Sequence, residues 1–255
     1  MAARGWRVFA TCRKPEDVAR LQSEGLESLR LDYTDPTSIA EACSEMLART
    51  DGRIDALFNN GAFAIPGAVE DLPRDALRAI FEANLFGPHD LTRRLLPAMR
   101  AQGHGRVVNC SSVLGLIALK WRGAYNATKF AMEGLTDTLR LEMRDTNIGI
   151  SLIEPGPIPT RFRLNAQANF ERWIDWQSSP RAKQYRDELR PRLYDTSGAP
   201  DRFELPPSAV TKALIHAVES PLPRAHYHVT HATRIAAAAR RLLPARAIDS
   251  LMSRM

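Results

Sequence analysis

Two side chains of this sequence stand at a spacing suited to moving a proton. Tyr125 and Lys129 lie four residues apart in the stretch GAYNATKFAMEGL, and on a helix that spacing places both side chains on the same face. A phenol with a pKa of about 10 exchanges protons poorly at neutral pH, but an adjacent ammonium favours the phenolate. We therefore expect Lys129 to lower the pKa of Tyr125 and make it a proton donor or acceptor.

Ser112 precedes Tyr125 by thirteen residues and lies just past the apolar stretch RVVNC. At the carboxyl end of a strand, its hydroxyl can hydrogen-bond the same substrate oxygen, and open parallel sheets bind ligands at such ends. Taken singly, a Tyr and Lys four apart are usually a solvated pair, and such a serine usually enters a turn. No G-x-S-x-G elbow surrounds Ser112, which argues against serine hydrolysis.

The elements that must position these groups follow from the hydropathy pattern. The 255 residues are 44% hydrophobic, which excludes a largely disordered chain and suits one domain. Short apolar stretches are expected as strands at 6–11, 29–31, 54–58, 106–110, 148–153 and 225–229. Between them, expected helices cover 15–24, 35–49, 73–99 and 122–144. This alternation predicts an α/β domain with a doubly wound, Rossmann-like parallel sheet.

Cysteine content and the absence of targeting segments indicate the compartment. Three widely separated cysteines make neither a disulfide framework nor a paired zinc motif. No apolar run reaches about 18 residues, and arginines interrupt the apolar start of the chain, so no spanning helix or signal peptide is predicted. We expect a cytoplasmic protein.

In combination, these motifs resemble the short-chain dehydrogenase/reductase family. The family carries a Ser, then Tyr-x-x-x-Lys, and an Asn on the preceding long helix, which corresponds to Asn84 in NLFG. The resemblance implies that Tyr125 donates or accepts the proton and that Lys129 lowers its pKa and holds the nicotinamide ribose. It also implies that Ser112 orients the carbonyl and that Asn84 helps to hold a proton-relay water.

Two further stretches are expected to bind the cofactor. IEPGPIPT resembles the family's P-G-x-x-x-T element, which implies Pro155 and Gly156 beside the nicotinamide and Thr160 near its carboxamide. The family's NNAG element appears here as NNGA, with Asn59 at the sheet centre. Gly61 permits a close backbone approach, and the exchanged alanine is expected to require a local adjustment.

The end of the first expected strand indicates the choice of nicotinamide cofactor. NAD-preferring relatives tend to have an acid there, but this chain has Cys12 followed by Arg13. A guanidinium suits a phosphate dianion, so we predict NADP(H), with Lys14 as a helper. Alternatively, Arg13 is merely exposed. Asp32 matches the family's adenine-contacting aspartate, or else caps the turn that follows it.

The front of the family's fold has no counterpart in this sequence. Its first strand, its T-G-x-x-x-G-x-G phosphate turn and its first helix are missing, and residues 1–5 resemble the end of that helix. The missing strand would lie between the strands at 6–11 and 54–58, so we expect unpaired backbone there. We interpret the sequence as N-terminally truncated. The alternative function is that of a non-catalytic relative acting as a binding or regulatory protein.

The substrate is expected to be a small-molecule carbonyl compound or alcohol that is bulky and apolar. Residues 161–207 carry several aromatic side chains outside the regular pattern and are predicted to form a substrate lid. The sequence resembles the branch of aldehyde reductases and steroid and retinol dehydrogenases, which implies interconversion of an aldehyde or ketone and its alcohol. Alternatively, Trp173 and Trp176 only pack the segment onto its own domain. The long helices at 73–99 and 122–144 resemble those the family uses to form homo-oligomers.

The last segment, 231–255, is basic and holds much of the +6 net charge. A docked helix with an arginine-rich solvent face is favoured over peripheral membrane contact, and nucleic-acid binding is not expected. No metal is expected: His226, His228 and His231 alternate near the last strand, but no nearby carboxylate or cysteine completes a ligand set.

Overall fold

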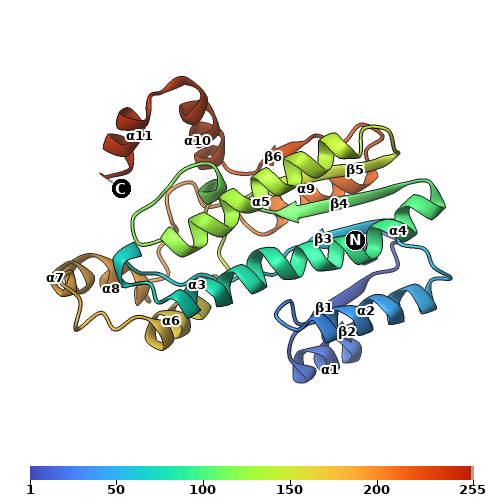
Figure 1. Ribbon diagram of the computed structural model, residues 1–255, viewed down its shortest axis with the longest axis horizontal. Coiled ribbons are helices and arrows are strands. Elements are labelled where there is room, and N and C mark those ends of the chain that lie inside the picture. The colour runs from blue at the N-terminus through green and yellow to red at the C-terminus, as the bar shows by residue number, and fades with distance from the viewer. Residues whose placement is uncertain (254–255) are drawn as a thin grey trace.

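Parallel strands form the centre of the fold in the computed structural model, which describes residues 1–253 (Figure 1). Among these residues, one sheet pairs β1 (Phe9–Cys12) with β2 (Glu27–Arg30). The other sheet has the order β3 (Ala56–Asn59), β4 (Gly105–Cys110), β5 (Ile148–Glu154), β6 (His226–His228). Every pairing is parallel, which confirms the predicted α/β class.

The division between the two sheets falls where the sequence predicts unpaired backbone. Within residues 1–253, no strand pairing joins β1 to β3. A short 3-10 turn, η1 (Ala2–Arg4), precedes β1 and ends at Gly5, whose φ of 85° places it in the left-handed region that favours glycine. The first five residues therefore form a short 3-10 turn, and its origin as the end of the family's first helix stays a prediction.

Helices join the strands close to the predicted positions. They are α1 (Pro15–Ser23), α2 (Pro36–Arg49), α3 (Arg74–Phe81), α4 (Gly87–Gln102), α5 (Gly123–Glu142) and α9 (Ser208–Glu219). Asp35 caps α2, because its carboxylate accepts hydrogen bonds from the backbone N–H groups of Thr37 and Ser38. The single helix predicted at 73–99 is instead interrupted by a π-helical turn, η3 (Glu82–Phe86).

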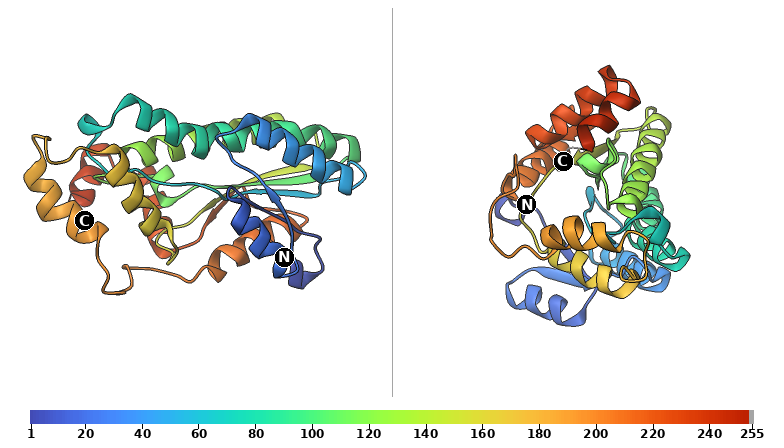
Figure 2. Two further views of the ribbon diagram at one scale, coloured as in Figure 1. Left: turned by 90° about the horizontal axis from the view of Figure 1, so that it is seen from below. Right: turned by 90° about the vertical axis from the view of Figure 1, so that its left-hand side faces the viewer.

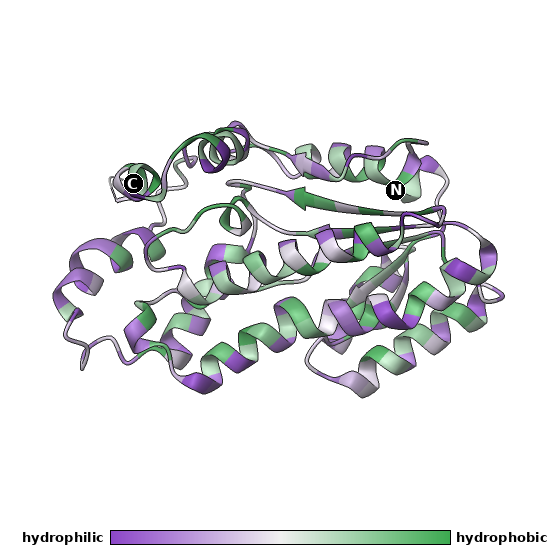
Figure 3. Ribbon diagram, turned by 45° about the horizontal axis from the view of Figure 1, so that its top comes forward, coloured by the Kyte–Doolittle hydropathy of each residue, from purple (hydrophilic) through white to green (hydrophobic). Residues whose placement is uncertain are grey.

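Both faces of the sheet are covered, as Figure 2 shows for α2, α4 and α5 on one side and α9 on the other. Val107 and Val108, neighbours on β4, are fully buried on opposite faces. Val107 belongs to a core with Ile39 and Leu95, whereas Val108 packs in a core with Ala217. The hydropathy colouring of Figure 3 agrees, with apolar strands between helices of mixed polarity.

Residues 161–207 fold into short helices beyond the ends of the strands. These are α6 (Phe162–Trp173), α7 (Ala182–Gln184), the π-helical turn η5 (Tyr185–Leu189) and α8 (Arg190–Leu193). Phe170 and Tyr185 are fully buried in a separate apolar cluster. The Tyr185 hydroxyl donates to Asp71 Oδ2 at 2.7 Å and accepts from the Ala68 N–H at 2.7 Å. These bonds attach the segment to the loop after β3.

The C-terminal helices α10 (His231–Leu242) and α11 (Ala245–Met252) form the red hairpin of Figure 1. Arg240 docks α10, because Nη1 donates to the carbonyls of Gly115 and Leu116 and the guanidinium lies 4.9 Å from the Phe130 ring centroid. This contact supports the docked helix; Arg254 of the basic segment lies outside the described residues. None of the helices in residues 1–253 combines the length and apolar content needed to cross a membrane.

Gly87 lets α4 approach the loop after β2. A Cβ at this position would lie 2.7 Å from Tyr33 Cα and closer still to the Tyr33 carbonyl oxygen. We expect Gly87→Ala to lower the free energy of unfolding by about 2–3 kcal/mol in urea denaturation. Gly134→Ala on α5, where an added Cβ meets nothing within 4 Å, should raise it by up to about 1 kcal/mol. Equal tolerance of both changes would contradict the close approach.

Candidate active site

Ser112 and Tyr125 meet at the carboxyl end of β4. Ser112 follows that strand and caps the 3-10 turn η4 (Val113–Gly115), with Oγ accepting from the Leu114 N–H at 3.1 Å. Tyr125 lies in the first turn of α5. The Ser112 hydroxyl interacts with the Tyr125 side chain and favours its phenolate, although burial has the larger and opposite effect on the pKa of Tyr125. The two hydroxyls can therefore address one substrate oxygen.

Lys129 lies one turn further along α5 and is 1% exposed. Its Nζ donates to the Cys110 carbonyl at 2.7 Å and lies 5.5 Å from the centroid of the Tyr125 ring. Burial lowers the pKa of Lys129 from its usual value. The predicted stacking of Tyr125 and Lys129 on one helix face is confirmed.

The predicted direction of the Tyr125 pKa shift is wrong for this arrangement. Tyr125 is 8% exposed, and Phe162 packs edge-on with ring centroids 5.3 Å apart. Burial raises the pKa of Tyr125 well above its usual range and outweighs the hydrogen bond from Ser112. The side chain is therefore a neutral phenol here, which is the form that donates a proton.

Asn84 lies within the π-helical turn η3 and is fully buried. Its Oδ1 accepts from the Phe63 N–H at 3.0 Å, and its Nδ2 donates to the Phe63 carbonyl and to Thr128 Oγ1 at 2.8 and 3.2 Å. Asn84 thus joins the loop after β3 to the residue before Lys129. The π-helical turn was not predicted from the sequence. Pro88 could have indicated an irregular turn there, because proline has no N–H to donate to the preceding turn of a helix.

Asn59 and Gly61 lie at the end of β3, but their contacts are structural. Asn59 Nδ2 donates to Asn109 Oδ1 at 2.8 Å and to Thr92 Oγ1 at 2.9 Å, which ties β3 to β4 and α4. A Cβ at Gly61 would lie 2.8 Å from a ring carbon of Tyr33. The close approach at Gly61 in this structure is therefore to Tyr33, and the cofactor roles of both residues stay predictions.

Pro155 and Gly156 lie beside the loop that carries Ser112. The Pro155 carbonyl accepts from the Val113 N–H at 2.8 Å, and a side chain at Gly156 would collide with Thr230. Thr160 is exposed, and its Oγ1 accepts from the Phe162 N–H at 3.2 Å at the start of α6. The P-G-x-x-x-T stretch therefore leads from the site into segment 161–207.

Arg13 and Asp32 follow the neighbouring strands β1 and β2. These strands form the two-stranded sheet, which is separate from the sheet that contains β4 and Ser112's loop. Arg13 is exposed, and in residues 1–253 it makes no ion pair. Asp32 Oδ1 accepts from the Thr34 N–H at 3.0 Å and from Thr34 Oγ1 at 2.8 Å. Asp32 thus makes the bonds of a turn cap, and its contact with adenine stays a prediction.

The expectation that no carboxylate lies near the histidines of the last strand is wrong. Two buried carboxylates, Glu154 on β5 and Glu133 on α5, accompany His226 on β6. They are 72 and 93 positions away from His226 in the sequence, so no local spacing indicates them. His231, at the exposed start of α10, is not part of this group.

Comparisons with known proteins agree with this geometry. Residues 1–170 match the family model described as short chain dehydrogenase. The oxidoreductase YbbO of Escherichia coli strain K12 is 40% identical over 248 residues, which cover 97% of this chain and 85% of that protein.

Solved structures share the fold. A short-chain dehydrogenase from Streptomyces avermitilis superposes with a TM-score of 0.75 at 27% identity, covering 99% of this chain and 88% of that one. A short chain dehydrogenase/reductase from Burkholderia phymatum, in complex with NAD, gives a TM-score of 0.74 at 24% identity over 92% of this chain and 83% of its own. At that identity, the second likeness supports the fold alone.

Proposed function

Because the chain belongs to the short-chain dehydrogenase/reductase family, we propose that it is an NADP(H)-dependent oxidoreductase that interconverts a carbonyl compound and an alcohol. The observation that carries the proposal is the buried Tyr125 phenol beside Ser112, with Lys129 Nζ 5.5 Å from the centroid of its ring. Such a constellation handles the proton that must accompany hydride transfer.

The residues of the site fit a bound nicotinamide cofactor, which supplies or accepts the hydride. Lys129 Nζ has three donors, of which the Cys110 carbonyl takes one and Met132 Sδ, at 4.0 Å, a second. The third donor suits a ribose hydroxyl. In reduction, the Tyr125 hydroxyl gives its proton to the carbonyl oxygen while Ser112 hydrogen-bonds that oxygen. Burial keeps Tyr125 in the neutral phenol form, which is the form that carries the proton this step requires.

Segment 161–207 is proposed to act as a substrate lid for a bulky apolar aldehyde or ketone. Phe162 packs directly on Tyr125, and Tyr185 stacks against Trp121 with ring centroids 4.7 Å apart. Trp173 and Trp176 are partly buried against the same cluster. An aromatic enclosure of this kind favours apolar ligands and excludes water from the proton transfer.

The reaction is tested by following NADPH absorbance with purified chain and a panel of aliphatic, aromatic and polycyclic aldehydes and ketones. We expect NADPH oxidation that depends on the carbonyl compound and is fastest with the bulkier apolar members. A protein that binds NADPH but oxidises it with none of the panel would favour the non-catalytic alternative.

Arg13 is proposed to select NADP(H) over NAD(H), because an exposed guanidinium without an acidic partner in the described chain suits the 2′-phosphate. We expect Arg13→Glu to raise the KM for NADPH by about 10- to 100-fold, the equivalent of a lost charge-assisted hydrogen bond, and to spare NADH. Arg144→Glu, at an exposed site on another surface, serves as the control. An unchanged ratio of NADPH to NADH use would reject the role of Arg13.

The expected homo-oligomer remains a prediction. Apolar side chains exposed on α5 and on the turn before α4 support it, since Phe86, Leu135 and Leu141 are 49%, 44% and 63% exposed.

A further inference from the structure

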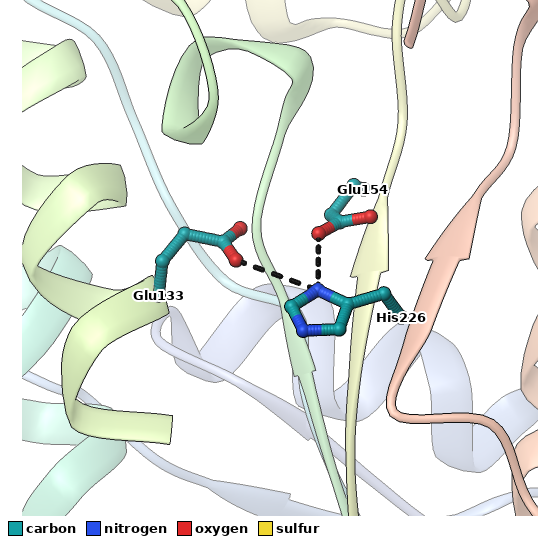
Figure 4. Close-up of side chains that lie close together, drawn as sticks. All are labelled: Glu133, Glu154 and His226. Atoms are coloured by element: carbon teal, nitrogen blue, oxygen red, sulfur yellow. Dashed lines mark hydrogen bonds and ion pairs between the residues drawn. The ribbon is translucent and has the colours of Figure 1, made fainter. Parts of the chain in front are cut away.

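A cluster of buried carboxylates and histidines lies outside the proposed active site (Figure 4). Glu133 projects from α5, Glu154 from the end of β5 and His226 from the start of β6. His226 Nδ1 lies 2.7 Å from Glu154 Oε1 and 3.8 Å from Glu133 Oε2. One ligand atom from each of the three side chains lies within 4.8 Å of the other two.

The charge of this cluster is balanced poorly by the protein. Glu154 is fully buried and Glu133 is 8% exposed. In residues 1–253, only histidines lie within ion-pair distance of these two carboxylates. Two buried acids without a lysine or arginine partner are unusual unless a cation joins them.

Unsatisfied polar atoms give a second, independent sign of a ligand. In the described chain, Glu133 Oε1, Glu154 Oε2 and His228 Nδ1 are buried and make no hydrogen bond of good geometry, although Ser111 lies beside Glu133. The last two atoms are in direct contact at ion-pair distance, without hydrogen-bond geometry. Buried polar atoms are normally hydrogen-bonded, and an ion is one of the few ways to satisfy several of them together.

An outer carboxylate orients His226 toward the cluster. His226 Nε2 lies 3.2 Å from Asp137 Oδ1 on α5, so its other ring nitrogen, Nδ1, faces the two glutamates. A carboxylate on one imidazole nitrogen and a metal on the other is the usual arrangement of metal-bound histidines.

We propose that Glu133, Glu154 and His226 bind a divalent first-row transition metal ion such as Zn²⁺. An ion held at about 2.0–2.2 Å by each ligand separates tetrahedral ligand atoms by roughly 3.3–3.6 Å. The present separations of 2.7 and 3.8 Å bracket that range, so small side-chain rotations suffice. The imidazole nitrogen favours such ions over Mg²⁺ and Ca²⁺, which prefer oxygen ligands.

A metal ion at this site would stabilise the fold next to α5, the helix that carries Tyr125 and Lys129. Tyr125, Lys129 and Glu133 follow one another at four-residue intervals on α5, so the ion lies one turn beyond Lys129. It would join α5 to β5 and β6, three elements far apart in sequence. A bound ion that favours the folded chain raises its thermal stability. The inference does not depend on the reaction proposed above.

The test is calorimetric titration of the chelator-treated full chain with ZnCl₂ and, separately, MgCl₂. We expect one Zn²⁺ per chain, weaker Mg²⁺ binding, and a higher Tm with Zn²⁺. His226→Ala and Glu133→Gln should each weaken Zn²⁺ binding at least about 10-fold, as should Asp137→Asn through the orientation of His226. His231→Ala, an exposed histidine outside the cluster, should bind Zn²⁺ like the wild type.

The outcomes separate a metal site from an ion-pair network. If the wild type binds no Zn²⁺, the proposal is overturned and the cluster is a network of buried ion pairs only. Zn²⁺ binding that survives in His226→Ala but falls in Cys12→Ser would place the ion on a thiol and would likewise overturn it. Because a substitution in the cluster can weaken the fold, each variant's urea unfolding without metal is measured, and Glu133→Gln, which keeps the side-chain shape, is the deciding variant.

Discussion

Tyr125→Phe should lower turnover by about 10²- to 10⁴-fold while leaving the fold intact, the range expected for loss of a general acid. The change removes one oxygen from a side chain that is 8% exposed, and it leaves the packing of the ring against Phe162 in place. Within the site, only the interaction of the hydroxyl with Ser112 is lost. The KM for NADPH should change little, since Lys129 remains.

Steady-state NADPH oxidation and urea unfolding of the same preparations check this result. Tyr194→Phe is the matched control, because that tyrosine lies in segment 161–207 and its hydroxyl bonds Glu171, a surface acid. It should keep wild-type turnover. Retained activity in Tyr125→Phe, with the control also active, would remove Tyr125 from the reaction. An unfolded Tyr125→Phe would instead mean that the contact between Tyr125 and Ser112 stabilises the loop after β4. In that case Ser112→Ala should be destabilised as well.

The relative positions of the candidate catalytic residues were predictable because they depend on local geometry. Tyr125 and Lys129 share a helix, and a four-residue interval fixes their relative positions whatever surrounds them. Ser112 follows from the end of an apolar strand. The π-helical turn at Asn84 was missed, because hydropathy with a helical period does not distinguish π from α geometry over five residues.

Long-range surroundings were not predictable in the same way. The pKa of Tyr125 depends on burial by Phe162, which comes from a different helix, and that burial reversed the shift expected from Lys129 alone. Glu133, Glu154 and His226 meet only because α5, β5 and β6 pack side by side. The divided sheet was predictable, however, since the strand order of the resembled family places the missing first strand between β1 and β3.

Lys129→Met should abolish activity and stabilise the protein, two effects of opposite sign. Turnover is expected to fall at least about 100-fold, because the ammonium that faces Tyr125 and suits the ribose is lost. Methionine replaces the aliphatic part of the lysine side chain with an apolar chain of similar length at a position that is 1% exposed. Burial lowers the pKa of Lys129, so the folded state holds this charge at a cost. The free energy of unfolding should rise by about 1 kcal/mol at pH 7, even though the bond to the Cys110 carbonyl is lost.

The pH dependence of stability isolates this charge. A lysine whose pKa is lower in the folded than in the unfolded chain makes the unfolded state bind more protons between the two values, so stability rises with pH up to the unfolded value of about 10.4. That rise should be present in the wild type and in Lys120→Met, an exposed lysine paired with Glu188, and smaller in Lys129→Met. If Lys129→Met is destabilised and keeps the wild-type pH profile, the ammonium stabilises the fold through its hydrogen bond. The buried charge of Lys129 would then cost the protein no stability.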